Sequence, residues 1–480
     1  MRASGRALTM RHFVGVGLVS LLAPREAHAC PCQRPTDPGG FNGYDYGAAP
    51  VQFHDGQSVR VWYVTTGPHA VNPASTQADM TPDNVVTATT VGDAALASYA
   101  QLGFTAPISD QGTTGCCGGD PKLDIYLMHF NANADGDSSA EGCQTVGKAR
   151  KCWSFGMVEA KLENGYGTFA LGAHIVIAHE LFHAVQDAYD EGLDRFWAEG
   201  TAQWAAKTIY PTETDLETNL PAFFSNAGQS IDTSGGVVAG YLYGSAIWPV
   251  FLTEHVDPNA VRGAFQQEAM LGAPSMAAID ASLPAFNSSL ADAYPTFVAW
   301  NAGTGTRAGM GGYANASTYP EATLTPFPAS NTVSDIATGY SAFFYSYDFG
   351  ATTQTLTLTG DATRVGARTF PLAGGKARLD QIANLPATVT GTGVVVVAGI
   401  SAKKSDAPFK LTAGPPMGAG GAGSTGASTG AGGSGGGKAG GCSCSTAPDP
   451  STPAWLAGMG LIAVRCLRRR HRGSVDRDPV

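Results

Sequence analysis

Two histidines and a glutamate stand at a spacing that could hold and use a metal ion. In the stretch HELFH at 179–183, His179 and His183 are four residues apart, so a helix places both imidazoles on one face. Glu180 projects about 100° around the helix from His179, beside a water bound to the shared ion. Neutral imidazoles bind Zn²⁺, the ion lowers the pKa of its water, and a nearby carboxylate takes the proton. We expect a zinc site with Glu180 as catalytic base; the alternative is a core helix with satisfied histidines.

A third ligand must come from farther along the chain, because catalytic zinc usually has three protein ligands and one water. Six residues past His183 stands Tyr189 rather than a histidine. The next candidate is Glu199, in FWAEGTAQW, sixteen residues past His183. A helix–turn–helix connection of that length can return the carboxylate to the site. The sequence predicts His179, His183 and Glu199 as the metal ligands, and the alternative for Glu199 is an exposed helix carboxylate.

This pattern, HExxH with a later glutamate on a second helix, resembles the gluzincins, the thermolysin-like clan of zinc metalloproteases. The order of VRVWYVT, a helix, KLDIYL, AHELFHAVQ and WAEGTAQW is similar to a family of secreted metalloproteases from myxobacteria. That similarity spans about residues 41–300. It implies an α+β fold class with a gluzincin-like protease domain, and hydrolysis of peptide bonds in extracellular protein or peptide.

The resemblance also implies supporting residues. Gluzincins often use a tyrosine from a later helix to stabilise the oxyanion, and here Tyr243 is the expected donor, with Tyr241 as the alternative; both could instead be core aromatics. Thermolysin-like enzymes place an acidic residue four after the ligand glutamate, where this chain has Gln203. Asp187, four residues after His183, is the other candidate to orient a ligand histidine, and the choice stays open.

Two other functions remain in view. The chain could be a surface-displayed adhesion or binding protein with an inactive or structural metal site, although nothing in HELFH looks damaged. It could also be an aminopeptidase, which needs a carboxylate to hold the free amine of the substrate, and no such motif stands out. We favour a secreted or cell-surface zinc endopeptidase.

The elements that position these residues follow from local patterns. Apolar residues at helical spacing predict helices over 83–102, 169–190, 195–209, 241–255 and 291–300. β-branched and aromatic runs predict strands over 59–65, 123–128 and 154–161, with a loop over 131–151. Within that loop, Asn131, Asn133, Asp135 and Asp137 resemble the start of a calcium loop, but no glutamate stands at the twelfth position. A Ca²⁺ site and a polar turn both remain open.

The ends of the chain predict export and display. Residues 1–29 read as a signal peptide: arginines, an apolar stretch, then Ala27-His28-Ala29; lipidation of Cys30 is the alternative. After a protease domain at 30–318 and a β-sandwich-like domain at 319–412 come a Gly/Ala/Ser-rich linker at 413–441 and a tail at 442–480. The tail's Cys motif, short hydrophobic segment and Arg cluster resemble a myxobacterial sorting signal. It implies transient membrane association and cell-surface display; a weak permanent anchor is the alternative.

Net charge and cysteine content limit the classes of partner and the compartment that the chain can have. The formal net charge is −10 over 480 residues, and both ends are basic, so the body is acidic and nucleic acid is excluded as a partner. The exported body holds six cysteines, for which an oxidising compartment predicts disulfides. Cys143 and Cys152 flank a short polar loop and could pair locally, while the pairing of the remaining cysteines stays open: Cys30, Cys32, Cys116 and Cys117.

Overall fold

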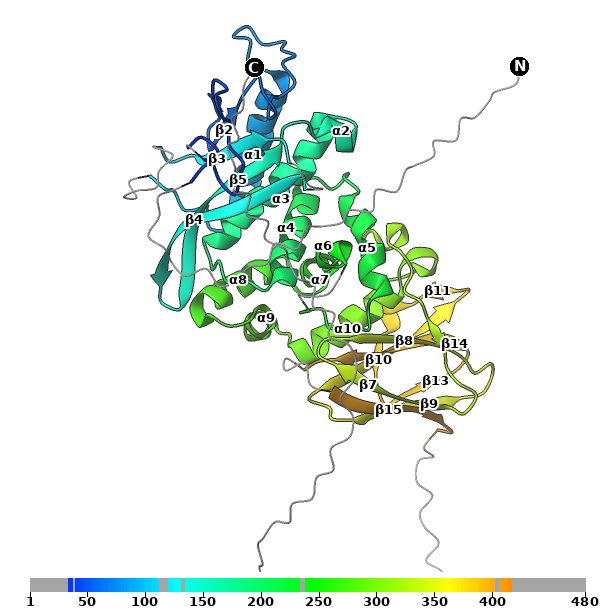
Figure 1. Ribbon diagram of the computed structural model, residues 1–480. Helices are drawn as coiled ribbons and strands as arrows, with labels where there is room; N and C mark the ends of the chain where they lie inside the picture. Colours follow the sequence, from blue (N-terminus) through cyan, green and yellow to red (C-terminus); the bar gives the residue numbers. More distant parts are fainter. Residues whose placement is uncertain are drawn as a thin grey trace, which may run out of the picture. The chain divides into compact units, whose positions relative to one another are not determined.

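The computed structural model describes residues 33–37, 39–111, 120–130, 134–233, 238–401 and 406–416. The expected signal peptide, most of the linker and the sorting tail lie outside these ranges. Most helices follow one another between an N-terminal sheet and two C-terminal sheets (Figure 1), so the predicted α+β class is confirmed. Among the described residues, no helix is long and apolar enough to cross a membrane.

A five-stranded sheet forms the first part of the fold, with strand order β1-β2-β3-β5-β4. Strands β2, β3 and β5 run parallel, and both edge strands run antiparallel to their neighbours. The bounds are β1 Gln52–Asp55, β2 Val59–Tyr63, β3 Leu123–Met128, β4 Gly136–Val146 and β5 Ala149–Glu159. The predicted strands over 59–65 and 123–128 are confirmed within two residues.

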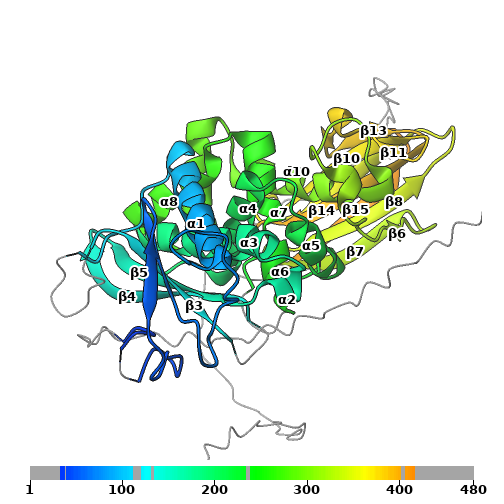
Figure 2. The same cartoon turned by 90° about the horizontal axis from the view of Figure 1, so that it is seen from above.

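Helices cover one face of this sheet and the N-terminal arm contacts the other. Helices α1 (Asp83–Gln101) and α3 (Phe169–Asp187) share a core with the sheet that includes Val61 and Ile125. On the other face Tyr46 is buried, and Phe41 packs edge-on against Phe155 at 5.2 Å between ring centroids. Figure 2 shows the helices and the dark blue arm on opposite sides of the strands.

The predicted loop over 131–151 is wrong, because most of it is strand. Strands β4 and β5 form a long hairpin in which Cys143 lies opposite Cys152, and a disulfide joins the two. The sequence of β4, GDSSAEGCQTV, has few β-branched or aromatic residues, so propensity did not reveal it. Cross-strand pairing and the disulfide hold this edge strand in place.

Further helices follow α3. The predicted helices over 195–209 and 291–300 are confirmed as α4 and α10, but 241–255 is not one helix. It divides into α6, α7 and a π-helical turn, since Gly244 packs against Phe223 and Pro249 lacks a backbone N–H. The bounds are α2 Glu163–Tyr166, α4 Arg195–Ile209, α5 Asp215–Ser225, α6 Ala239–Gly244, α7 Ile247–Phe251, the π-helical turn Leu252–Val256, α8 Ala260–Leu271, α9 Ser275–Ser282 and α10 Leu290–Ala302.

Two further sheets follow helix α10. One has the order β11-β10-β14-β8-β6 with β12 beside β10, and the other the order β13-β9-β15-β7. Their bounds are β6 Thr325–Pro326, β7 Thr332–Thr338, β8 Ala342–Asp348, β9 Gln354–Gly360, β10 Val365–Ala373, β11 Lys376–Ala377, β12 Ala383–Asn384, β13 Ala387–Val389, β14 Thr392–Gly399 and β15 Asp406–Gly414.

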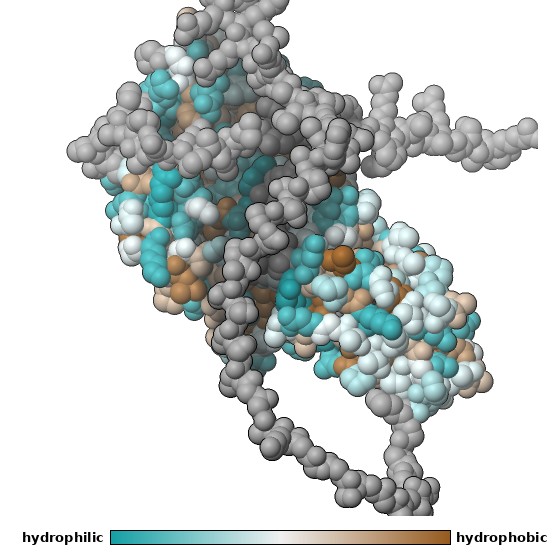
Figure 3. All heavy atoms as spheres, turned by 60° about the horizontal axis from the view of Figure 1, so that its bottom comes forward, coloured by the Kyte–Doolittle hydropathy of each residue, from teal (hydrophilic) through white to brown (hydrophobic). Residues whose placement is uncertain are grey.

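Strand β14 shows how these layers stack. Val394 and Val396 belong to the core shared with α10, whereas Val395 and Val397 belong to the core between the two sheets. The strand is therefore apolar on both faces, which explains its unbroken valine run. On the face drawn in Figure 3, hydrophobic side chains are scattered among hydrophilic and intermediate ones.

Candidate metal centre

The three predicted ligands converge in the structure. Helix α3 carries both histidines and helix α4 carries Glu199, and their three donor atoms lie within 4.8 Å of one another. Nε2 of His179 is 3.1 Å from Nε2 of His183 and 3.3 Å from Oε2 of Glu199, while His183 Nε2 is 3.8 Å from that oxygen. Two imidazoles and a carboxylate thus point at one place.

These separations fit a tetrahedral zinc ion. Ligand atoms at about 2.0–2.1 Å from zinc, at tetrahedral angles, stand roughly 3.3 Å apart. The two imidazole Nε2 atoms, which cannot both donate to each other, would gain a common partner in a cation. A donor set of two histidines and one glutamate is also one that catalytic zinc uses. In the part of the chain that the structure describes, this is the one group of three ligating side chains so close together.

Helix α3 places its functional residues inside the protein. Thr168 caps its start, with the threonine hydroxyl accepting from Leu171 N at 3.1 Å. The helix is apolar almost all round, and Tyr99 of α1 donates to the carbonyl of Ala178 at 2.7 Å. The histidines are therefore held on a helix that packing fixes on nearly every side.

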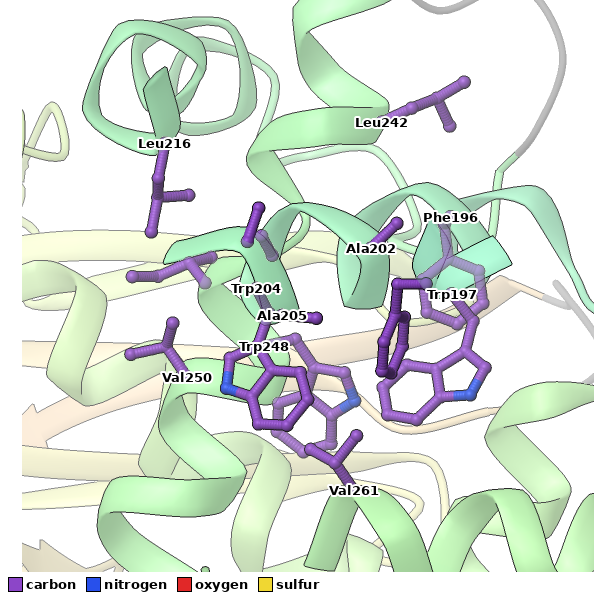
Figure 4. Close-up of a cluster of buried hydrophobic side chains, with 14 of the residues drawn as sticks. Phe196, Trp197, Ala202, Trp204, Ala205, Leu216, Leu242, Trp248, Val250 and Val261 are labelled. Atoms are coloured by element: carbon purple, nitrogen blue, oxygen red, sulfur yellow. The ribbon is translucent and has the colours of Figure 1, made fainter. Parts of the chain in front are cut away.

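Helix α4 is fixed by large aromatic side chains. Phe196, Trp197 and Trp204 are buried beneath it, together with Trp248 of α7 (Figure 4). Gly200 follows Glu199, the predicted glutamate ligand, and a Cβ on Gly200 would lie 2.5 Å from the hydroxyl oxygen of Ser245. This close packing against the segment between α6 and α7 sets where Glu199 emerges.

In the part of the chain that the structure describes, neither candidate for orienting a predicted ligand histidine is hydrogen-bonded to one. Asp187 accepts a short hydrogen bond from Ser154 on β5, and Gln203 bonds to Asp215 at the start of α5. The partner of a ligand histidine is Gln186, whose Oε1 lies 2.7 Å from Nδ1 of His183. Sequence reasoning missed Gln186, although its place three residues after His183 on the same helix face was a usable signal.

Glu180 lies beside the ligands and against the edge strand. Burial, followed by the charges of Asp137, Glu199 and Asp135, raises the pKa of Glu180 well above its usual value. A Cβ on Gly136 would lie 2.5 Å from Oε1 of Glu180, so the first residue of β4 must be small. The backbone of β4 therefore passes directly against the predicted base.

Electrostatics differ between Glu199 and the histidines. Burial alone would raise the pKa of Glu199, but its hydrogen bond with His179 and the nearby imidazoles lower it to about 2. Burial, and then the neighbouring His179, lower the pKa of His183. An ionised carboxylate beside a neutral imidazole is the state in which both can bind a metal.

Tyr243 lies against the site, whereas none of the described contacts joins Tyr241 to it. The ring centroid of Tyr243 lies 5.6 Å from that of His179. The charge of Glu199, together with burial, raises the pKa of the Tyr243 hydroxyl, which keeps it a hydrogen-bond donor. Tyr241 is buried and its hydroxyl points to the carbonyl of Ser230 at 3.3 Å, which matches the core-aromatic alternative for that residue.

The proposed calcium loop is only partly described. Asn131 and Asn133 lie outside the described residues. Asp135 accepts from the Tyr166 hydroxyl at 2.9 Å, and Asp137 accepts from Ser139 at 2.9 Å. The Ca²⁺ expectation therefore remains a prediction.

Comparisons with known proteins add little to this geometry. No known protein family and no curated protein matches the sequence. One solved structure similar to the chain is Legionella pneumophila aminopeptidase A in complex with aspartic acid, at 12% identity and a TM-score of 0.33. The match covers 72% of this chain and 35% of that one. A likeness this low carries no argument about activity, so the case for function rests on the residues of the site.

Proposed function

We propose that this chain is an exported zinc-dependent endopeptidase of the gluzincin type, acting on extracellular protein or peptide. The observation that carries the proposal is the convergence of His179, His183 and Glu199 within 4.8 Å, with the carboxyl group of Glu180 buried beside them. When bound there, a zinc ion would lower the pKa of a water molecule and polarise the substrate carbonyl.

The residues of the chain supply the remaining steps. Glu180 takes the proton of the attacking water and then delivers it to the leaving amine. The hydroxyl of Tyr243 donates a hydrogen bond to the oxyanion that develops on the substrate carbonyl. Gln186 holds the Nδ1 proton of His183.

The position of an edge strand beside Glu180 supports the proposal that the substrate is a peptide. Among the described strands, β4 pairs on one side with β5, and its first residue lies against Glu180. Unpaired main-chain groups on an edge strand can bind an extended peptide as an added strand. Such binding would present a bond in the middle of a peptide, which favours an endopeptidase.

The proposal is tested by zinc content and by cleavage of a peptide blocked at both ends. The wild-type protein should hold about one zinc per chain and cleave the blocked peptide, which a strict aminopeptidase cannot do. Glu199→Gln should lose both properties, because an amide is a poor zinc ligand. Zinc without cleavage in the wild type would favour the surface binding protein with a structural metal site. No zinc would refute the endopeptidase and favour the binding protein with an inactive metal site.

A further inference from the structure

Gln186 is buried between the two helices that carry the ligands, and all its polar atoms are engaged. Its Oε1 lies 2.7 Å from Nδ1 of His183. Its Nε2 donates to the carbonyl of Ala198 at 2.8 Å and to the hydroxyl of Thr201 at 2.8 Å. Only 3% of Gln186 is exposed, so water cannot replace these partners.

The contacts on the nitrogen side fix which way the amide points. The carbonyl oxygen of Ala198 can only accept a hydrogen bond, so the atom facing it must be the NH₂ group. The Thr201 hydroxyl donates its own proton to the carbonyl of Trp197, at 2.6 Å, and can therefore only accept from the amide. The amide oxygen is left to face His183.

An oxygen at that position decides the tautomer of His183. Since Oε1 can only accept, Nδ1 of His183 must carry the proton. The lone pair of the ring then lies on Nε2, the atom that faces His179 and Glu199. The imidazole is thus held ready to bind a metal before the metal arrives.

The same amide joins the two ligand-bearing helices. Ala198 directly precedes Glu199 on α4, and Gln186 follows His183 by three residues on α3. One side chain therefore sets both the proton position of one ligand and the distance between helices that brings the other ligand near.

We propose that Gln186 is a positioning residue for the metal centre: it fixes the Nδ1 proton of His183 and ties the helix of Glu199 to that of the histidines. This inference rests on the proposed function, because it assumes that the site binds a metal. Hydrogen-bond partners of ligand histidines typically contribute about 10- to 100-fold to metal affinity.

The first experiment compares two variants of the full chain: one removes every hydrogen bond of the Gln186 amide, and the other removes the Thr201 hydroxyl with its bond from Gln186. Gln186→Met leaves the Nδ1 proton of His183 without its acceptor, whereas Thr201→Val removes an acceptor of the amide and keeps the bonds from Gln186 to His183 and Ala198. Zn²⁺ affinity is measured on metal-free protein by competition with a chromogenic chelator. The thermal midpoint of the metal-free protein is measured alongside.

We expect Gln186→Met to weaken zinc binding about 10- to 100-fold, while Thr201→Val leaves it essentially unchanged and both lower the thermal midpoint. Gln186→Glu, which keeps an acceptor for His183, should bind zinc more tightly than Gln186→Met. Equal zinc affinity of Gln186→Met and wild type would overturn the inference and leave the proposed function standing. Equal loss in Thr201→Val would reduce Gln186 to a structural residue, and a wild type that binds no zinc would refute both proposals.

A second measurement does not depend on how the variants fold. Long-range ¹H–¹⁵N spectra of the ¹⁵N-labelled, metal-free wild-type protein report which ring nitrogen of His183 is protonated. We expect the Nδ1–H tautomer for His183. The Nε2–H tautomer would contradict the hydrogen bond to Gln186 and overturn the inference.

Discussion

Two regions of the molecule bury several ionisable groups, but they differ in whether a basic side chain pairs with the buried carboxylates. On the sheet face opposite α3, the guanidinium of Arg34 is 5% exposed and forms ion pairs with Asp110, Asp124 and Glu141. Burial alone would lower the pKa of Arg34, but the hydrogen bond to Glu141 and the surrounding negative charges raise it. This region contains its own cation.

The metal centre contains carboxylates without such a partner. In the part of the chain that the structure describes, no lysine or arginine forms an ion pair with Glu180 or Glu199. Glu180 is 9% exposed, and the nearby charges that act on its pKa are all negative. We therefore interpret the Arg34 region as structural. In the candidate metal centre, by contrast, a bound cation would balance the charge of the buried carboxylates.

The largest expected effect is on activity, in Glu180→Gln. The amide keeps the shape of the side chain but cannot accept and deliver a proton, so hydrolysis should fall about 10²- to 10⁴-fold. Zinc content should stay at the wild-type level, because Glu180 is not a ligand. Cleavage of the blocked peptide and metal analysis of the same sample check this, and cleavage at the wild-type rate would refute the role of Glu180.

The next effect is on stability, in Arg34→Met. The substitution leaves three buried carboxylates without their cation, so the free energy of unfolding should fall by about 3–5 kcal/mol. Urea unfolding measures it. Peptide cleavage per folded molecule should remain at the wild-type level; a stable variant with reduced cleavage would mean that the Arg34 region serves the active site instead of the fold.

Tyr243→Phe should act at the metal centre alone. Loss of one donor to the oxyanion lowers kcat about 10²- to 10³-fold, while KM and the free energy of unfolding change little. Steady-state kinetics on the blocked peptide separates the two constants. Tyr241→Phe is the control, since its hydroxyl bonds to main-chain carbonyls away from the ligands; equal loss in both variants would refute the assignment.

Glu268 gives an intermediate case, a buried carboxyl for which no lysine or arginine of the described residues forms an ion pair. It accepts from Trp197 Nε1 at 3.1 Å, and burial raises its pKa to about 8. The unfolded chain loses this proton near pH 4.3. Between about pH 4.3 and pH 8 the folded state holds one more proton, so the free energy of unfolding falls as the pH rises, by up to about 1.4 kcal/mol per unit.

Glu268→Gln should remove that dependence. Relative to the wild type, the variant should become more stable as the pH is raised from 5 to 8, and urea unfolding at the two pH values measures the difference. A constant difference between the two proteins would show that Glu268 ionises alike in the folded and unfolded states.

The convergence of the three predicted metal ligands could be anticipated because their geometry is local. His179 and His183 are one turn apart on one helix, and Glu199 follows after a single helical return. Gln186 could not be assigned in this way, since its role depends on the carbonyl of Ala198 and the hydroxyl of Thr201, which only the packing of α4 on α3 brings near. Gln203 was plausible by spacing, but α5 engages it through Asp215.

The strands of the first sheet likewise differ in whether local sequence predicts them. Strands β2 and β3 are rich in β-branched or large apolar residues, and their bounds were predicted closely. Strand β4 is polar and glycine-containing, and it exists because β5 pairs with it over its length. The close approach of Gly136 to Glu180 could not be predicted either, since it depends on where that strand crosses helix α3.

The packing of helix α10 against the sheets that follow it limits how far the gene can be shortened. Its Tyr294 donates to the carbonyl of Tyr340 at 2.5 Å, and Asp292 pairs with Arg368 of β10 at 2.5 Å. Val394 and Val396 of β14 belong to the same core as this helix. A frameshift or stop codon near 318 would therefore keep every predicted metal ligand but expose the apolar face of α10. The expected phenotype is an aggregating product in which the sequence of the candidate site is intact.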